Sequence, residues 1–267
     1  MVSAIAHPTD LLPEGTAAFE HALSLALANR CRLDLLHVDD PRAGTDWSDF
    51  PRVRETLQRW GILPEGASVE EVHAATGVRV RKVGIRDRAP VAGLAHFLGQ
   101  HQADLIVMAT HGRAGVDRLF NGSVTAELVQ TLRVPTLVLG PAARSVVDPE
   151  NGRLAIRNVL VPVDHDPDPH TALDAIEQIA ANLALRLDFI HIGATAPVLR
   201  DGRNGPRTVR TVEGPVVETL LAEAEAADLV AMPMAGALGL VDALRGSTTE
   251  QLVREVSCPV LALPVAR

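Results

Sequence analysis

The sequence predicts an α/β protein in which a parallel sheet occurs twice in tandem. The segment "AHPTD" beginning at Ala6 resembles "LVPVD" beginning at Leu160. At the same spacing of 154 residues, "RLDLLHV" from Arg32 falls without a gap on "RLDFIHI" from Arg186. In both halves, short apolar runs alternate with segments of helical period. Strands separated by helices imply right-handed crossovers and a parallel sheet that helices cover on both faces.

The first copy contains five apolar runs that we expect to be strands. They lie around Ile5, Leu33–Val38, Val78–Val83, Leu105–Met108 and Thr136–Leu139, and helices are expected over Thr16–Ala28 and Pro90–His101. An extra charged piece, Pro41–Gly77, carries both tryptophans, Trp47 and Trp60. We expect this piece to add a helix around Arg54–Trp60 beside the functional site.

The second copy repeats the pattern in a shorter form. Its expected elements are strands at Asn158–Val163, Leu187–Ile192, Val209–Val212, Leu229–Met232 and Leu261–Leu263, with helices at Ala172–Leu185 and Val216–Ala226. The spacing between copies falls from 154 to 124 residues at "DLIVMATHGRAG" (Asp104) and "DLVAMPMAGALG" (Asp228), so about 30 residues are missing. We therefore predict a first domain over residues 1–143, a linker rich in Pro, Gly and polar residues over 144–156, and a second domain over 157–267.

Composition excludes several classes of function. The net charge of −8 argues against a general nucleic-acid or acidic-membrane binder. Apolar stretches are too short for a membrane helix and the N-terminal segment does not resemble a signal peptide, so we expect a cytoplasmic protein. Cys31 and Cys258 lack metal-ligand spacing and are interpreted as reduced, packed thiols. The only lysine, Lys82, precedes Val83, which disfavours a Walker P-loop.

The segment "MATHGRAGVDRLFNGS", Met108–Ser123, carries the main chemical signal. Its glycines begin where an expected strand ends, which is where parallel sheets bind ligands. Gly122 and Ser123 then open an amphipathic segment, and free N–H groups at a helix N-terminus attract anions. The hydroxyls of Ser123 and Thr125 and the side chains of His111 and Arg113 suit a polyphosphate. The alternative is that the glycines only punctuate turns and Ser123 only caps its helix.

These motifs together resemble the universal stress protein family in its tandem form. The glycine pattern, the "PTD" after the first strand and "VPTLVLG" carry the resemblance. It implies two five-stranded, Rossmann-like domains similar to adenine nucleotide α-hydrolases, with ATP bound in the first copy. Asp10 would be within reach of an accompanying Mg²⁺. The nucleotide-binding residues that the resemblance implies are Pro8, Thr9, Asp10, Val38, Met108, Ala109, His111, Gly112, Arg113, Gly122, Ser123, Val124 and Thr125.

One departure from the family pattern lies in the first copy, where Ala109 replaces the first glycine of the motif. Alanine weakens binding only where the backbone needs a positive φ, and we expect that it does not do so here.

The second copy departs further, and we expect its site to be weaker or degenerate. Pro233 replaces the first glycine and removes an N–H donor, while alanines replace His111 and Arg113. The helix start "STTE" is a capping box that adds a negative charge. The residues of this weaker site would be Pro162, Val163, Asp164, Ile192, Gly236, Gly246, Ser247 and Thr248.

Three other patterns have simpler interpretations. The loop "DHDPDPH" offers His165, Asp166, Asp168 and His170 as metal ligands, but we favour solvated loop charges and expect no metal site. His37 and His191 occupy equivalent strand positions, which favours a shared packing role over catalysis. The basic loop Arg200–Arg207 is interpreted as a solvated hairpin.

The favoured function is an ATP-binding protein of stress response or regulation, in which the nucleotide changes conformation or partner binding. No general base, phosphate-binding lysine or paired acid is evident for catalysis, although slow ATP hydrolysis remains open. Two alternatives stay open: a nucleotide-free interaction scaffold, and an adenylate-forming enzyme. The resemblance also implies that the last strands of the two copies pair, which would make the chain a pseudo-dimer. The resemblance does not identify a protein partner, and it leaves open whether two chains form a homodimer.

Overall fold

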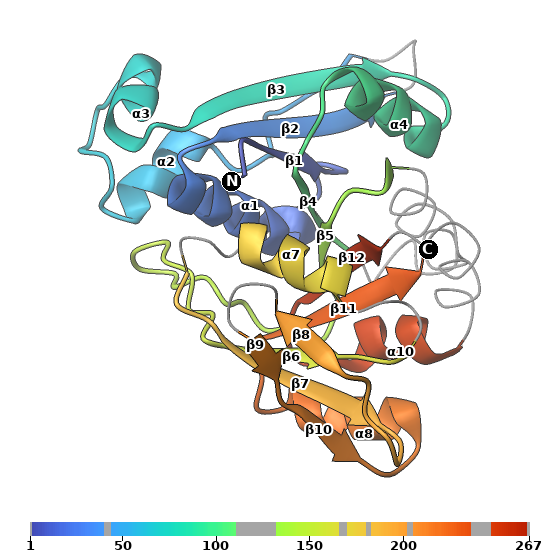
Figure 1. Ribbon diagram of the computed structural model, residues 1–267. Helices are drawn as coiled ribbons and strands as arrows, with labels where there is room; N and C mark the ends of the chain where they lie inside the picture. Colours follow the sequence, from blue (N-terminus) through green and yellow to red (C-terminus); the bar gives the residue numbers. More distant parts are fainter. Residues whose placement is uncertain are drawn as a thin grey trace.

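The computed structural model describes residues 2–39, 44–110, 132–165, 170–179, 183–201, 205–235 and 247–265. Within these ranges, ten strands form one sheet in the order β10-β7-β6-β11-β12-β5-β4-β1-β2-β3 (Figure 1). The strands of the first copy are β1 (Ala4–Pro8), β2 (Arg32–Asp39), β3 (Arg79–Arg86), β4 (Leu105–Ala109) and β5 (Thr136–Leu139). Those of the second copy are β6 (Asn158–Pro162), β7 (Arg186–Ile192), β10 (Val209–Val212), β11 (Leu229–Ala235) and β12 (Val260–Val265).

Each copy supplies five parallel strands in the same order, with its first strand between its second and its fourth. The two sets meet where β5 and β12 pair antiparallel, with Leu137 opposite Leu261. The predicted α/β class is confirmed, and the pairing expected between the last strands joins the two sheets into one. The joint also covers two apolar strand edges that would otherwise be exposed.

Helices cover both faces of the sheet. The helices are α1 (Thr16–Asn29), α2 (Val53–Arg59), α3 (Val69–Thr76), α4 (Pro90–Gln100), α7 (His170–Ile179), α8 (Val216–Ala224) and α10 (Ser247–Glu255). A short 3-10 turn, η1 (Pro13–Gly15), precedes α1. Helices α1 and α7 lie side by side over the centre of the sheet in Figure 1 and bury one apolar cluster that spans both copies. On the other face, α4 buries one cluster and α8 with α10 buries another.

Two boundaries and one helix differ from the sequence expectation. The described part of α7 runs to Ile179 and residues 183–185 are not helical, whereas the helix was expected to reach Leu185. Strand β11 continues through Pro233 to Ala235. Helix α3 was not expected, although its start carries a capping box in which Ser68 accepts from the Glu71 amide and Glu71 accepts from the Ser68 amide. The helix ends at Gly77, whose φ of 73° suits glycine.

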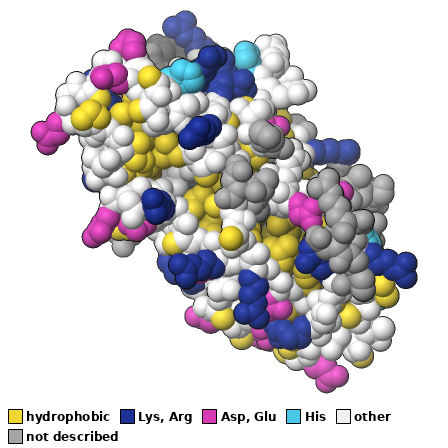
Figure 2. Space-filling model, turned by 60° about the vertical axis from the view of Figure 1, so that its left-hand side comes forward, with side chains coloured by type: hydrophobic (Ala, Val, Ile, Leu, Met, Phe, Trp, Pro, Cys, Tyr) yellow, Lys and Arg dark blue, Asp and Glu magenta, His cyan; other side chains and the backbone are white. Residues whose placement is uncertain are grey.

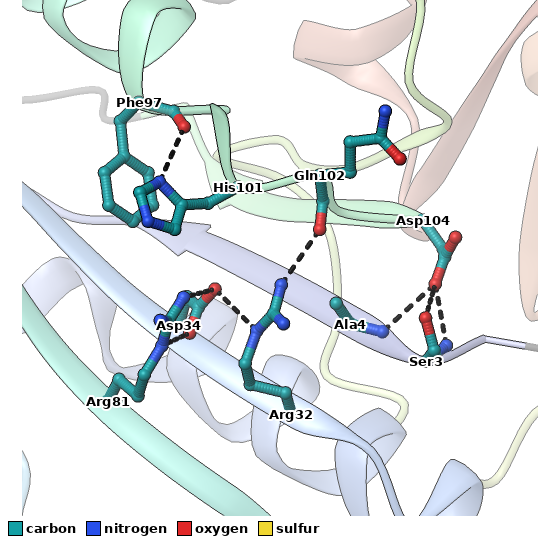
Figure 3. Close-up of polar contacts among 9 residues, drawn as sticks. All are labelled: Ser3, Ala4, Arg32, Asp34, Arg81, Phe97, His101, Gln102 and Asp104. Atoms are coloured by element: carbon teal, nitrogen blue, oxygen red, sulfur yellow. Dashed lines mark hydrogen bonds and ion pairs between the residues drawn. The ribbon is translucent and has the colours of Figure 1, made fainter. Parts of the chain in front are cut away.

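Carboxylates hold together the amino ends of the strands (Figure 3). Asp34 is fully buried and receives a bidentate contact from Arg81, at 2.6 and 2.8 Å, and a third bond from Arg32 at 3.0 Å. Asp104 accepts from the amides of Ser3 and Ala4, at 2.7 and 3.1 Å. The second copy repeats the Asp104 contacts: Asp228 accepts from the amides at positions 157 and 158, each at 2.9 Å.

The segment 144–156 is a packed connection between the copies. The Ser24 hydroxyl of α1 donates to the Gly152 carbonyl at 2.6 Å, and the Val146 amide donates to His21 Nε2 at 3.2 Å. On the other side, the Arg144 amide donates to the Ser257 carbonyl at 2.8 Å. The connection therefore contacts both copies, which its Pro, Gly and polar content did not indicate.

Two smaller expectations hold in the fold. The basic loop contains the antiparallel hairpin of β8 (Leu199–Asp201) and β9 (Gly205–Arg207). Cys31 and Cys258 are buried free thiols, and burial raises the pKa of each to about 11, so both pack as small apolar groups.

The surface is mixed in character. Figure 2 shows acidic and basic side chains interspersed with hydrophobic ones on one face of the molecule. No helix in the described ranges has both the length and the apolar composition of a membrane span.

Candidate functional site

The candidate site begins where β1 and β4 separate at their carboxyl ends. Their ladder pairs Ile5 with Leu105 and Ala6 with Ile106, which are its only registered pairs in the described residues. One residue further on, the buried ring of His7 spans the gap and donates from Nδ1 to the Val107 carbonyl at 2.8 Å. Since β1 has β2 on one side and β4 on the other, this is the point at which strand order reverses. Ligands of open parallel sheets bind at such points.

The loop after β1 is held in place by hydrogen bonds to β2. The Thr9 amide donates to the Leu36 carbonyl at 2.9 Å, and the Thr9 carbonyl accepts from His37 Nδ1 at 2.7 Å. Within the loop, the Leu11 amide donates to Thr9 Oγ1 at 3.0 Å, and the Leu12 amide donates to Asp10 Oδ1 at 3.1 Å. Leu11 has a φ of 66°, so the chain turns sharply after an exposed Asp10. These bonds preorganise the "PTD" segment at the edge of the crevice.

The described half of the predicted site lies at the carboxyl ends of β1, β2 and β4. Pro8 ends β1 and Val38 lies near the end of β2. Met108 and Ala109 end β4, paired with Val138 and Leu139. These four residues, with Thr9 and Asp10, therefore share the carboxyl edge of adjacent strands. His111, Gly112, Arg113, Gly122, Ser123, Val124 and Thr125 lie outside the described residues.

Ala109 has an extended backbone. It pairs with Leu139 inside the parallel ladder, and the residues with positive φ outside glycine are Leu11, Arg30 and Arg133 in the described ranges. Its methyl group therefore adds no backbone strain at this position.

The extra piece of the first copy reaches the site through residues 44–50 rather than through its helix. Trp47 packs edge-on against His37, the residue that holds the Thr9 carbonyl, and against Phe50. Helix α2 is present as expected, but it contacts α1 and the connection: Arg59 pairs with Glu20, and Trp60 packs on Gly152. The helix expected beside the site thus lies on the flank of α1.

His37 and Lys82 have partners that explain their positions. His37 Nε2 lies 3.0 Å from Asp39 Oδ1, so both ring nitrogens are engaged and the histidine is a satisfied packing residue, as expected. The Lys82 ammonium lies over the rings of Trp47 and Phe50, at 5.1 and 5.6 Å from their centroids. Burial, with a contribution from Arg52, lowers the pKa of Lys82.

The second copy keeps the scaffold of the crevice. The Val163 amide donates to the Ile190 carbonyl at 2.8 Å, and the Val163 carbonyl accepts from His191 Nδ1 at 3.0 Å. Pro162, Asp164 and Ile192 occupy the positions of Pro8, Asp10 and Val38. Gly236 and Gly246 lie outside the described ranges, as do the side chains of Ser247 and Thr248 at the start of α10.

Comparison with known proteins bears on both halves of the chain. The sequence model of the universal stress protein family matches residues 1–140 and 198–264, which together exceed half of the sequence. The chain belongs to the universal stress protein family. A universal stress protein of Methanocaldococcus jannaschii is 26% identical over 135 residues, covering 49% of this chain and 78% of that protein.

Solved structures extend the likeness to the whole fold. A universal stress protein from Archaeoglobus fulgidus superposes with a TM-score of 0.64 at 20% identity, covering 98% of this chain and 96% of the other. A functionally unknown protein from Pseudomonas aeruginosa gives a TM-score of 0.60 at 15% identity, covering 98% and 92%. At these identities the likeness shows the fold alone.

Sequence reasoning missed two features near the strand ends. The first is Asp39, which stands two residues after His37 and thus on the same face of β2, a spacing that was visible in the sequence. The second is a cluster of Asp164, His165 and His191, in which His191 comes from a different strand. Spacing within the loop "DHDPDPH" could not reveal the second feature.

Proposed function

We propose that the first copy binds ATP at the crevice between β1 and β4. Bound nucleotide would change the conformation or the partner surface of the protein in stress response or regulation. The observation that carries this proposal is the "PTD" loop, which four hydrogen bonds hold at the carboxyl ends of β1 and β2. Preorganisation of this kind lowers the entropy that binding must otherwise remove.

The chemistry around the loop supports a nucleotide over other ligands. Ala109 ends β4 in extended conformation and directs the chain into the glycine-rich segment, whose composition suits phosphate binding. The half-buried side chain of Val38 suits the flat face of a base, whereas the side chain of Met108 is buried in the apolar cluster under α4. Family membership raises the expectation of a nucleotide, and the residues quoted above are those that the family pattern assigns to it.

The proposal is tested by thermal unfolding with and without ATP and magnesium. A ligand at about 100 times its Kd stabilises the native state by about 2.7 kcal/mol, so the parent chain should gain several degrees in Tm. Gly122→Val should abolish this gain, because a branched side chain would block the close approach of phosphate. The matched control is Gly246→Val at the equivalent position of the second copy, which should keep the gain.

The outcomes separate the alternatives. Absence of any ATP-dependent gain at millimolar concentration would favour a nucleotide-free interaction scaffold. Release of phosphate or pyrophosphate, followed in the same samples, would identify a slow ATPase or an adenylate-forming enzyme. The cytoplasmic location and a homodimer stay predictions of the sequence.

A further inference from the structure

A carboxylate and two imidazoles converge at the carboxyl end of β6 and β7 in the second copy. One ligand atom each from Asp164, His165 and His191 lies within 4.8 Å of the other two. The two rings meet edge to face with their centroids 5.4 Å apart. His191 is buried, whereas Asp164 and His165 are exposed, so the cluster is open to solvent on one side.

The first copy lacks this cluster because two equivalent positions differ. His165 stands where the first copy has Leu11, so the second copy has gained an imidazole beside its aspartate. Gly193 stands where the first copy has Asp39, whose carboxylate lies 3.0 Å from His37 Nε2. A Cβ at Gly193 would lie 2.7 Å from His191 Nε2. The second copy thus lacks the carboxylate that engages Nε2 and leaves that side of the ring uncrowded.

Both histidines are oriented by backbone carbonyls. His165 Nε2 donates to the Thr195 carbonyl at 2.9 Å, and His191 Nδ1 donates to the Val163 carbonyl at 3.0 Å. Because a carbonyl only accepts, each of these nitrogens carries the proton, and the other nitrogen of each neutral ring keeps its lone pair. Metal-binding histidines are characteristically held in this way, with one N–H on a carbonyl and the other nitrogen free for the metal.

The geometry points to a divalent transition-metal site formed by Asp164, His165 and His191, which binds its ion without nucleotide. Two imidazole nitrogens and one carboxylate oxygen suit Zn²⁺ and similar ions, whereas Mg²⁺ and Ca²⁺ prefer oxygen ligands alone. Three protein ligands leave a coordination position for water or for a group from a partner. The second copy would then hold a metal where the first copy holds ATP.

The test is Zn²⁺ titration of the full-length, nucleotide-free protein by calorimetry. The parent should bind one Zn²⁺ per chain, and His165→Leu, which restores the residue of the first copy, should bind it at least about tenfold more weakly. Asp164→Asn should also weaken binding. His96→Gln is the control, because His96 is an exposed histidine on α4 whose ring contacts only Gln100 in the described residues; this variant should bind like the parent.

Two results would overturn the proposal. The first is the absence of saturable Zn²⁺ binding by the parent. The second is a Zn²⁺ affinity of His165→Leu that equals that of the parent or is no lower than that of His96→Gln. Because the side chains of Asp164 and His165 are exposed, circular dichroism of each variant should show an unchanged fold. Co²⁺ in place of Zn²⁺ provides a second readout, since its visible absorption bands should appear in the parent and disappear in His165→Leu. Because no nucleotide is present, failure here leaves the ATP proposal unaffected.

Discussion

Ala109 shows how a single position of the glycine motif can change without altering the local backbone. It is the last residue of β4 and pairs with Leu139 in the parallel ladder. Glycine is required only where φ is positive or where the backbone must approach another group closely. The extended conformation of Ala109 does not need a positive φ, so alanine is compatible with the backbone of this strand.

We expect Ala109→Gly to leave the ATP affinity unchanged and to destabilise the protein slightly. Glycine inside a strand costs about 0.5–1 kcal/mol relative to alanine, because the unfolded chain gains freedom. Isothermal titration with ATP and urea unfolding would measure the two effects. A clear gain in ATP affinity would contradict this interpretation, since it would mean that the bound state needs a backbone that alanine resists.

At the scale of elements, the amino ends of the strands are fastened by the same device in both copies. Asp104 ties β4 to the start of β1, and Asp228 ties β11 to the start of β6. Burial opposes ionisation of Asp104, but the bonds from Ser3 and Ala4 outweigh it and hold the pKa of its carboxyl below the ordinary value. These contacts fix the register of β1 against β4, on which the crevice at the other end depends.

Removing either carboxylate should therefore destabilise its own copy. We expect Asp104→Ala and Asp228→Ala each to lower the free energy of unfolding by about 1–3 kcal/mol, because each leaves backbone amides without their charged acceptor. Asp49→Ala, at an exposed position, should change it by less than about 0.5 kcal/mol. Urea unfolding compares the three variants, and equal effects in all of them would argue against a fastening role.

Most of the strands and helices could be predicted from the sequence, and there are physical reasons why the others could not. The strands and α1 followed from apolar periodicity, and the pairing of the last strands of the two copies followed from the family resemblance. Helix α3 was not predicted because its short apolar face gives a weak periodic signal, although Ser68 and Glu71 mark its start. The length of β11 depends on tertiary pairing, such as that of Pro233 with Leu263. The Asp164–His165–His191 cluster requires residues from two strands, which no local pattern relates.

At the scale of the whole molecule, the two copies are joined by more than the β5–β12 pair. The connection between them packs on α1 through His21 and Ser24, and on the second copy through Arg144. Gly140, just after β5, permits a further close approach, because a Cβ there would lie 1.9 Å from the Val253 carbonyl of α10. The strand pair, the connection and this close approach therefore all join the two copies.

His21 makes this junction sensitive to acid. Burial lowers the pKa of His21 from its ordinary value of 6.5, against opposing contributions from the Ala17 carbonyl and Glu20. The unfolded chain then takes up a proton more readily than the folded chain, so stability is complete above about pH 6.5 and falls as pH drops below it. At pH 5.5 the loss from this residue is at most about 1.4 kcal/mol.

Urea unfolding at pH 7.5 and 5.5 measures this effect. His21→Gln should be less stable than the parent at pH 7.5, because the hydrogen bond that His21 Nδ1 donates to the Ala17 carbonyl is lost, but it should lose less stability between the two pH values. The exposed His96→Gln should keep the pH dependence of the parent. An identical pH dependence in the parent and in His21→Gln would show that His21 is not responsible.

The most direct measurement of the central claim is native mass spectrometry of the full-length protein with ATP and magnesium. Our account assigns the nucleotide to the first copy alone, so it predicts one ATP per chain in the parent and in Gly246→Val, and none in Gly122→Val. A parent chain that carries no nucleotide at millimolar ATP would contradict the proposed function. Two nucleotides per chain would contradict the division of roles between the copies.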